Sequence, residues 1–202
     1  MQQDGLIARN VVIVGTGGLA RDVLWLLRCH NDAGMEPAYV FLGFLSPAWT
    51  GSGEEVCGVP VLGPEDLLAG QHEEGGALAV CALDDPRDRK ETMVRLRNRG
   101  VQFISLVHAS AAVSPLARIG TGCLLLPGAV VSTEAHVGEG AVIHAHASVG
   151  PRALVGDFAV VGAGARLGGL SVVGEAAWVG PNSVIAEGQR VSPGPVAGPG
   201  TA

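Results

Sequence analysis

The chain has 202 residues, enough for one large domain or two small ones. Hydrophobic residues make up 48% of it, but aromatic residues only 4% and charged residues only 16%, and glycine occurs 31 times. Abundant Val, Leu and Ala argue against disorder, because such a chain can bury apolar surface. The net charge is −6 and no basic run is present that could follow a phosphate backbone, which argues against nucleic-acid binding.

Two further patterns indicate a cytoplasmic protein. The sequence contains neither an apolar run of roughly 18 residues, as a membrane span needs, nor the basic-then-apolar order of a signal peptide. Its four cysteines, Cys29, Cys57, Cys81 and Cys123, are widely spaced and show no metal-ligand pairing. We therefore expect reduced, mostly buried thiols and a cytoplasmic location.

Strands and helices alternate in residues 1–106, which predicts a small parallel α/β domain. The expected strands are Val11–Val14, Ala38–Leu45, Val59–Leu62, Ala77–Leu83 and Gln102–Leu106. The expected helices are a pattern running through Arg21–Leu27, a short one at Pro64–Ala69 and an amphipathic one at Asp84–Arg99. Ligands of such sheets bind at the carboxyl ends of the strands, here Gly15–Gly18, Leu45–Ser46 and Cys81–Leu83.

A glycine turn, Gly15-Thr16-Gly17-Gly18, stands between the first strand and the first helix. Strand, glycine turn and helix in this order can bring backbone N–H groups against a phosphate at a helix N-terminus. The match to G-x-G-x-x-G is incomplete, because Ala20 or Arg21 stands where the third glycine would fall. A tight turn with no ligand is the alternative interpretation.

A six-residue repeat fills the second half of the chain. From Val107 to Val191 an aliphatic residue recurs at every sixth position, and a small residue, usually Ala, follows four positions later as far as Ser183. Period six fits neither a helix nor a long strand, but it fits very short strands joined by corners. Fifteen hexads predict about five coils of 18 residues each, stacked through backbone hydrogen bonds.

The whole chain resembles a known group of enzymes, the bacterial nucleotide-sugar acetyltransferases that include bacillosamine N-acetyltransferases and sialic-acid O-acetyltransferases. The resemblance rests on VVIVGTGGLARDVL, FLGFL, GVPVLG, DDPRDRK, SLVHASAAVSPLARIGTGCLLLPGAVV and VGDFAVVGAGA. It implies a Rossmann-like nucleotide-sugar-binding domain over residues 1–106 and a hexapeptide-repeat left-handed β-helix over residues 107–202. It also implies a homotrimer that transfers an acetyl group from acetyl-CoA to an amino or hydroxyl group of a nucleotide-linked sugar.

The resemblance also implies where ligands bind. The nucleotide sugar is expected at the strand ends of the first domain, on Gly15, Thr16, Gly17, Gly18, Ser46 and Leu83. Acetyl-CoA is expected along a groove between adjacent β-helices, on Gly162, Gly164, Arg166 and Gly169. No metal is expected, because the pair His144-x-His146 has no third ligand at a suitable spacing.

Several positions depart from the pattern of these enzymes. They usually carry a His after the glycine turn, a catalytic His six residues before the Asp of the G-D-F segment, and another His two residues after its Phe. The corresponding residues here are Leu19, Pro151 and Val160, and the acidic residue that orients the catalytic His is replaced by Arg152. Acidic residues that often follow the second strand are replaced by Ser46 and its neighbour Pro47.

The loss of these histidines weakens the expected chemistry, because a positioned base typically contributes about 10²–10⁴-fold to acyl transfer. Proline has no titratable group, and an Arg side chain stays protonated. His144 and His146, in the preceding hexad, are the substitute candidates for the base, and solvated surface imidazoles are the alternative interpretation. His144 follows the inward Ile143 and is expected to face outward, between Leu126 and Gly162 of neighbouring coils.

Three functional hypotheses follow from the sequence. The first is an acetyl-CoA-dependent acyltransferase whose base has moved to His144 or His146. The second is a non-catalytic trimeric scaffold or ligand-binding relative that has lost its chemistry together with the usual His. The third is a transferase that uses another acyl donor or a different small acceptor.

Overall fold

The computed structural model describes residues 8–51, 53–68 and 77–194. The chain divides into two compact units, one made of residues 1–84 and 92–104 and the other of residues 85–91 and 105–202. Each unit is described by itself below. Among the residues that the structure describes, no helix combines the length and apolar character needed to cross a membrane.

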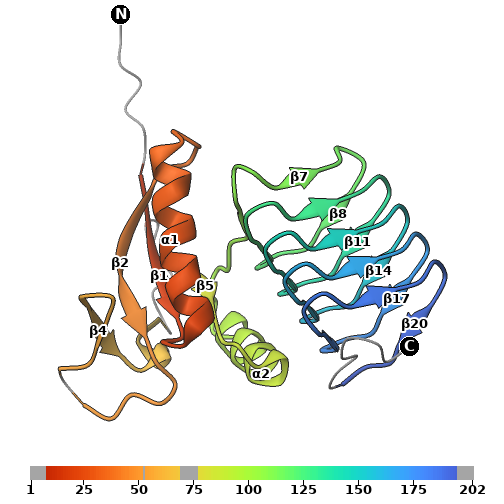
Figure 1. Cartoon of the computed structure of the whole chain (residues 1–202). Coiled ribbons are helices and arrows are strands. Elements are labelled where there is room, and N and C mark those ends of the chain that lie inside the picture. Colours follow the sequence, from red (N-terminus) through yellow and green to blue (C-terminus); the bar gives the residue numbers. More distant parts are fainter. Residues whose placement is uncertain (1–7, 52, 69–76, 195–202) are drawn as a thin grey trace, which may run out of the picture. The chain divides into compact units, whose positions relative to one another are not determined.

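The first unit is built on a five-stranded sheet in the order β3-β4-β2-β1-β5 (Figure 1). The strands are β1 (Arg9–Val14), β2 (Tyr39–Leu45), β3 (Glu55–Val56), β4 (Val59–Gly63) and β5 (Leu78–Cys81). All pairings are parallel except that of β3 with β4. Strand β1, which lies between β2 and β5, is apolar and buried from Val11 to Val14 and contributes to the core of this unit.

Three helical segments accompany this sheet in the chain: α1 (Gly18–Asp32), the 3₁₀ helix η1 (Glu65–Leu68) and α2 (Pro86–Arg97). Helix α1 buries one apolar stripe, which includes Leu19, Val23 and Leu27, and exposes its opposite face. The described residues contain only two α-helices, so the Rossmann-like character expected of this unit is not confirmed. A small, mostly parallel α/β sheet is what the structure gives.

Two expectations for this half of the chain are corrected. The strand expected at Gln102–Leu106 is not a strand, because Phe103 forms only an isolated bridge with Ala79 and Leu106 already begins the next sheet. The short helix expected at Pro64–Ala69 is the 3₁₀ turn η1, and Ala69 lies outside the described residues. The hydrophobic pattern marked both segments, but it did not distinguish a strand from a single bridge.

The second unit is a parallel β-helix of fifteen two-residue strands (Figure 1). These are β6 (Leu106–Val107), β7 (Ala112–Val113), β8 (Arg118–Ile119), β9 (Leu124–Leu125), β10 (Val130–Val131), β11 (His136–Val137), β12 (Val142–Ile143), β13 (Ser148–Val149), β14 (Leu154–Val155), β15 (Val160–Val161), β16 (Arg166–Leu167), β17 (Val172–Val173), β18 (Trp178–Val179), β19 (Val184–Ile185) and β20 (Arg190–Val191). They form three five-stranded sheets, β6-β9-β12-β15-β18, β7-β10-β13-β16-β19 and β8-β11-β14-β17-β20. The predicted five coils are confirmed, and the stacked sheets fit a left-handed β-helix.

The interior of the β-helix follows the repeat residue by residue. Each strand pairs in parallel with the strand one coil away, as Val131 does with Val113 and Val149. The second residue of each strand points inward beside the small residue that precedes the strand, so Ala129 and Val131 are both fully buried. Such a core admits aliphatic side chains and alanine but almost no rings, which explains the low aromatic content.

The corners between strands share one backbone conformation. From Gly122 to Gly188, the third residue after each inward aliphatic residue has a positive φ. Seven of these residues are not glycine: Glu134, His146, Arg152, Phe158, Leu170, Ala176 and Asn182. The left-handed conformation costs an L-residue about 1–2 kcal/mol. Each of the seven except Glu134 donates its backbone N–H to a carbonyl in the corner one coil earlier, as Arg152 does to Thr133, and these bonds offset the strain.

Arg89, in the first part of α2, is fully buried within the second unit. Its guanidinium donates to two backbone carbonyls, from Nε to Gly140 at 2.9 Å and from Nη2 to Phe158 at 2.8 Å. Both carbonyls belong to left-handed corner residues of adjacent coils. One side chain therefore joins the start of α2 to two coils of the β-helix.

Substitution of Gly156 should test the close approach of the coils. A Cβ at Gly156 would lie 2.7 Å from the backbone nitrogen of Glu175, where only a shift of one coil could make room. We expect Gly156→Ala to lower the free energy of unfolding by about 1–3 kcal/mol, measured by urea denaturation. The control Gly188→Ala meets no atom within 4 Å. Its φ of +70° costs about 1–2 kcal/mol of strain, part of which is offset by the lower freedom of alanine in the unfolded chain, so it should lose less stability than Gly156→Ala. Equal losses in the two variants would contradict this explanation.

Loss of the Arg89 guanidinium should destabilise the second unit. Arg89→Met keeps the aliphatic bulk but leaves two carbonyls without this donor, and an unsatisfied buried polar group costs about 1–3 kcal/mol. We expect the free energy of unfolding to fall by about 2 kcal/mol or more in thermal or urea melts. The control Arg87→Met, at an exposed position of the same helix, should stay within about 0.5 kcal/mol of the parent. A neutral Arg89→Met would refute the role given to this side chain.

Candidate functional site

The glycine turn lies at the carboxyl edge of the sheet in the first unit. Gly15 follows β1, has a φ of +124° and donates its N–H to the carbonyl of Leu45 at the end of β2. A Cβ at Gly15 would lie 2.6 Å from the carbonyl oxygen of Ala82, just after β5. Only glycine fits where the backbones of three strand ends approach one another this closely.

The other residues expected to bind a nucleotide sugar gather at the same edge. Ser46 directly follows β2, is buried, and accepts a hydrogen bond from the N–H of Ala48 on its hydroxyl. Leu83 follows β5, and its side chain lies 3.4 Å from the position of a Gly15 Cβ. Gly17 and Gly18 are exposed, and Thr16 is half-buried. The structure thus brings these six residues together at the ends of β1, β2 and β5.

A carboxylate that sequence reasoning did not single out sits in the same place. Asp84 Oδ1 accepts a hydrogen bond from the backbone N–H of Leu19 at 3.1 Å, in the first turn of α1. Its Oδ2 lies against Gly17, whose missing Cβ would be 2.2 Å away. The signal available in the sequence was an Asp directly after a buried strand, at a sheet edge that already held a glycine turn.

His144 and His146, the candidates for a relocated base, lie in the corner between β12 and β13. His144 is half-buried, and its N–H bonds to the carbonyl of Val161 in the next coil, as the predicted stacking requires. His146 is exposed, has a φ of +57° and lays its imidazole over Gly128 of the preceding coil. The two imidazoles therefore sit on one edge of the β-helix, with glycine making room for the second.

Pro151 and Arg152 lie in a different corner, the one between β13 and β14. Both are exposed, and the sheet that contains β13 separates them from the corner that holds His144 and His146. Within one chain, neither imidazole can take the place that Pro151 occupies. A base at His144 or His146 would therefore serve a reaction centre at a different edge of the β-helix from the one that holds Pro151.

The residues expected to contact acetyl-CoA are consecutive along one coil. Gly162 and Gly164 lie in the corner between β15 and β16, Arg166 opens β16 with an exposed side chain, and Gly169 lies in the following corner. Together they run across the outer face of the sheet that contains β16, from the corner before this strand to the corner after it. A Cβ at Gly162 would lie 2.7 Å from the backbone nitrogen of Pro181, and one at Gly164 would lie 2.3 Å from Asn182 Oδ1, so both glycines make room for the next coil. The Arg166 guanidinium provides a positive charge on the same coil.

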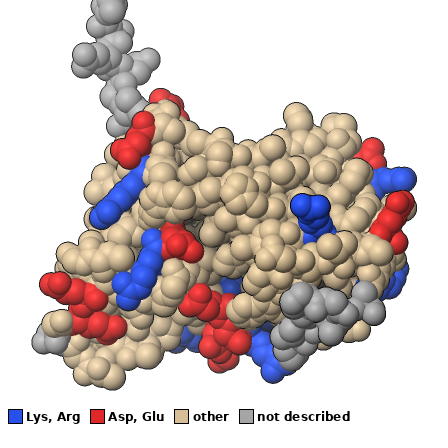
Figure 2. Space-filling model, in the orientation of Figure 1, with Lys and Arg blue, Asp and Glu red and all other residues tan. Residues whose placement is uncertain are grey.

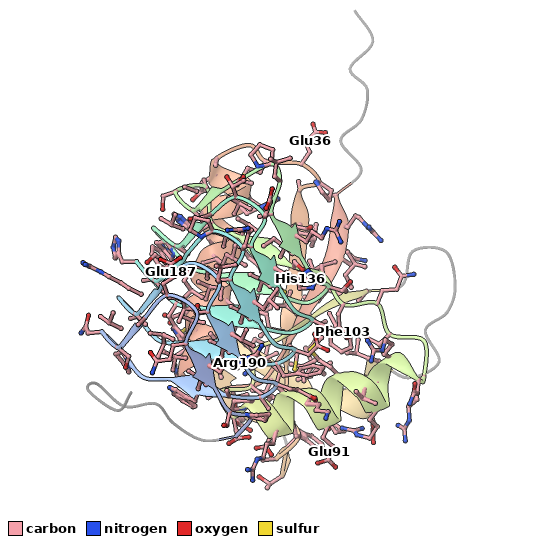
Figure 3. All side chains as sticks on the ribbon, turned by 90° about the vertical axis from the view of Figure 1, so that its right-hand side faces the viewer. Glu36, Glu91, Phe103, His136, Glu187 and Arg190 are labelled. Atoms are coloured by element: carbon pink, nitrogen blue, oxygen red, sulfur yellow. The ribbon has the colours of Figure 1, made fainter. Side chains whose placement is uncertain are left out.

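The other charged groups of the β-helix are dispersed. His136 and Arg190 are the exposed first residues of β11 and β20, two strands of the sheet β8-β11-β14-β17-β20 (Figure 3). On the face shown in Figure 2, the described Lys, Arg, Asp and Glu residues are scattered among mostly neutral residues. Among the described residues, no group of three or more His, Cys, Asp and Glu side chains gathers in a way that could hold a metal ion.

The cysteines offer no activated nucleophile inside the β-helix. Cys123 is buried and its thiol donates to the carbonyl of Gly138; burial raises the pKa of this thiol from 9.0 to about 11. The structure forms no disulfide among the four cysteines; Cys57 is exposed and Cys29 is half-buried. The expectation of mostly buried thiols therefore holds for Cys81 and Cys123 only.

Comparison with known proteins gives matches to solved structures. No protein-family model matches the chain, and no curated protein does. The acetyltransferase domain of PglB from Neisseria gonorrhoeae, in complex with acetyl coenzyme A, matches with a TM-score of 0.71 and 22% identity over 94% of this chain and 98% of that one. WeeI from Acinetobacter baumannii matches with a TM-score of 0.74 and 19% identity over 94% and 92%. These two likenesses concern the fold.

A third match is closer in sequence. A His-to-Ala variant of GDP-perosamine N-acetyltransferase from Caulobacter crescentus, in complex with CoA and GDP-perosamine, matches with a TM-score of 0.60 and 27% identity over 92% of this chain and 90% of that one. The resemblance to bacterial nucleotide-sugar acetyltransferases is confirmed. It covers the sheet unit and the β-helix alike.

The raised pKa of Cys123 predicts selective thiol modification. At pH 8 a thiol with a pKa of about 11 is roughly one part in a thousand thiolate, and its burial further slows reaction. We expect a disulfide reagent such as DTNB to modify Cys57 first in the native protein and to reach Cys123 only in denaturant. The fast phase should disappear in Cys57→Ser and persist in Cys123→Ser. Loss of the fast phase in Cys123→Ser would contradict the assignment.

Proposed function

We propose that this protein is an acetyl-CoA-dependent acyltransferase that acetylates the amino group of a nucleotide-linked sugar, as a homotrimer in the cytoplasm. The observation that carries the proposal is the match, over nine-tenths of both chains, with an N-acetyltransferase bound to CoA and GDP-perosamine. The homotrimer is proposed from the resemblance to the bacterial nucleotide-sugar acetyltransferases.

The acceptor is proposed to bind the domain formed by residues 1–106, at the carboxyl edge of its sheet. This edge combines features of a Rossmann-like site, namely a glycine turn, a buried Ser46 and the half-buried Leu83 at the ends of parallel strands. Backbone groups and a hydroxyl can position a sugar nucleotide through hydrogen bonds. Since Ser46 stands where the related enzymes carry acidic residues, the base of the nucleotide is expected to differ from theirs.

The acyl donor is proposed to lie on the β-helix of residues 107–202, across Gly162, Gly164 and Gly169. Arg166, exposed on β16, supplies a positive charge for a phosphate of CoA. On the neighbouring strands of its sheet, Arg166 pairs with Ser148 and Val184, neither of which carries a charge. Binding of CoA should therefore depend more on shape and backbone hydrogen bonds than on ion pairs.

The absence of an imidazole at Pro151 favours an amine over a hydroxyl as the attacking group. A hydroxyl must lose its proton as it attacks, so it depends fully on a base. An amine that is already deprotonated needs mainly correct placement, which can supply a large part of the rate. His144 or His146, in neutral form, can accept the proton that the attacking nitrogen sheds, while the acetyl group passes to nitrogen and the CoA thiol leaves.

The test is turnover with purified full-length protein, acetyl-CoA and a panel of UDP- and GDP-linked amino sugars, followed by release of the CoA thiol. We expect acetylation of at least one amino sugar, with kcat lowered about 10²-fold by substitution of whichever of His144 and His146 acts as the base. The variants are His144→Ala and His146→Ala. His136→Ala, on the outward face of another sheet, is the matched control and should retain full activity.

Two results would contradict the proposal in different ways. Turnover that survives in both His variants and in their combination would exclude the relocated base but not the transferase. No turnover with any acceptor, together with no measurable acetyl-CoA binding by calorimetry, would favour the non-catalytic relative. The non-catalytic function is supported by Pro151 and Arg152, because neither side chain can act as a base.

A further inference from the structure

Helix α1 begins without a cap of its own. Its N-cap residue is Gly17, which has no side chain to accept a hydrogen bond, and no acidic residue stands in its first turn. In most helices an Asp, Asn, Ser or Thr at this position accepts the N–H of the second or third helical residue. Here the second helical residue is Leu19, and its N–H donates to the Asp84 carboxylate from 65 residues away.

The same carboxylate fills the space above the turn. Asp84 Oδ2 lies where a Gly17 Cβ would be, and Oδ1 lies 3.9 Å from the corresponding point on Gly18. A bound phosphate would need this space and these N–H groups, because helix N-termini hold anions through their first backbone amides. Glycine at position 17 is thus explained by contact with the chain's own carboxylate.

We propose that Asp84 caps α1 and excludes phosphate from the glycine turn, so that this sheet edge selects acceptor groups that donate hydrogen bonds. The carboxylate satisfies the Leu19 amide, occupies the site sterically and repels an incoming anion. A carboxylate at the end of a parallel strand suits hydroxyl groups of a ribose or sugar, or an ammonium group, because all of these donate.

This inference rests on the proposed function in one respect, the assignment of the acceptor to this edge. Hydroxyl or amino groups of the bound nucleotide sugar then lie beside Asp84, and its phosphates lie away from α1.

The experiment is a titration of full-length ¹⁵N-labelled protein with inorganic pyrophosphate at low ionic strength, where electrostatic effects are largest. The signals to follow are the backbone amides of Gly17, Gly18 and Leu19. The variants are Asp84→Asn, which keeps an acceptor for the Leu19 amide but removes the charge, and Asp84→Ala, which removes both. The matched control is Asp85→Asn, which changes the net charge equally at the neighbouring residue, where Asp85 caps α2 through the N–H groups of Arg87 and Asp88.

We expect pyrophosphate to leave these three amides unmoved in the parent protein and in Asp85→Asn. In Asp84→Ala it should shift them with a Kd at least about tenfold below any seen in the parent, with Asp84→Asn in between. Saturable shifts of the same amides in the parent, at the affinity of Asp84→Ala, would overturn the proposal. If the variants do not fold, saturable shifts of these three amides in the parent protein alone overturn the proposal. Acetyl-CoA is absent throughout, so the outcome is separate from that of the turnover assay.

Discussion

The structure depends on backbone contact between successive coils. Every coil repeats the previous one at a spacing set by parallel-strand hydrogen bonds, and at the corners the backbones approach so closely that Gly156 has no room for a Cβ. Inward positions must then be filled by residues whose size hardly varies, as Ala129 and Val131 illustrate. Once the spacing is fixed, the composition, the six-residue period and the left-handed corners follow from it.

The β-helix was predictable because each hexad repeats one physical requirement, so fifteen weak signals added up to a strong one. The sheet unit was less predictable, because its elements occur once each and their ends depend on tertiary contact. Gln102–Leu106 shows this: its apolar pattern is that of a strand, yet only Phe103 meets a partner in that sheet. Local sequence indicates that a segment is buried, but the partner decides what structure it adopts there.

The candidate site, too, was only partly predictable from the sequence. The glycine turn and the strand ends were found from the sequence because strand, glycine and helix follow one another directly. Asp84 and Arg89 were not found, because each acts on backbone far away in the chain, Leu19 for the first and Gly140 and Phe158 for the second. The sequence can place Asp84 at the sheet edge, directly after a buried strand, but no local pattern marks which distant helix a side chain caps or which corners it joins. Such residues emerge only when the fold brings backbone donors and acceptors to them.

The low charge of the chain and the missing histidines both bear on how it would bind and position an anionic ligand. With Arg166 as the basic residue on the proposed CoA path and a carboxylate at the glycine turn, ion pairs contribute little to holding an anionic ligand. Binding must then come from backbone amides, hydroxyls such as that of Ser46, and apolar contact, all of which depend on precise shape. An enzyme with a weak base also gains most of its rate from placement of the acceptor. Under the proposed function, the corners and the capped turn of this chain serve both binding and chemistry.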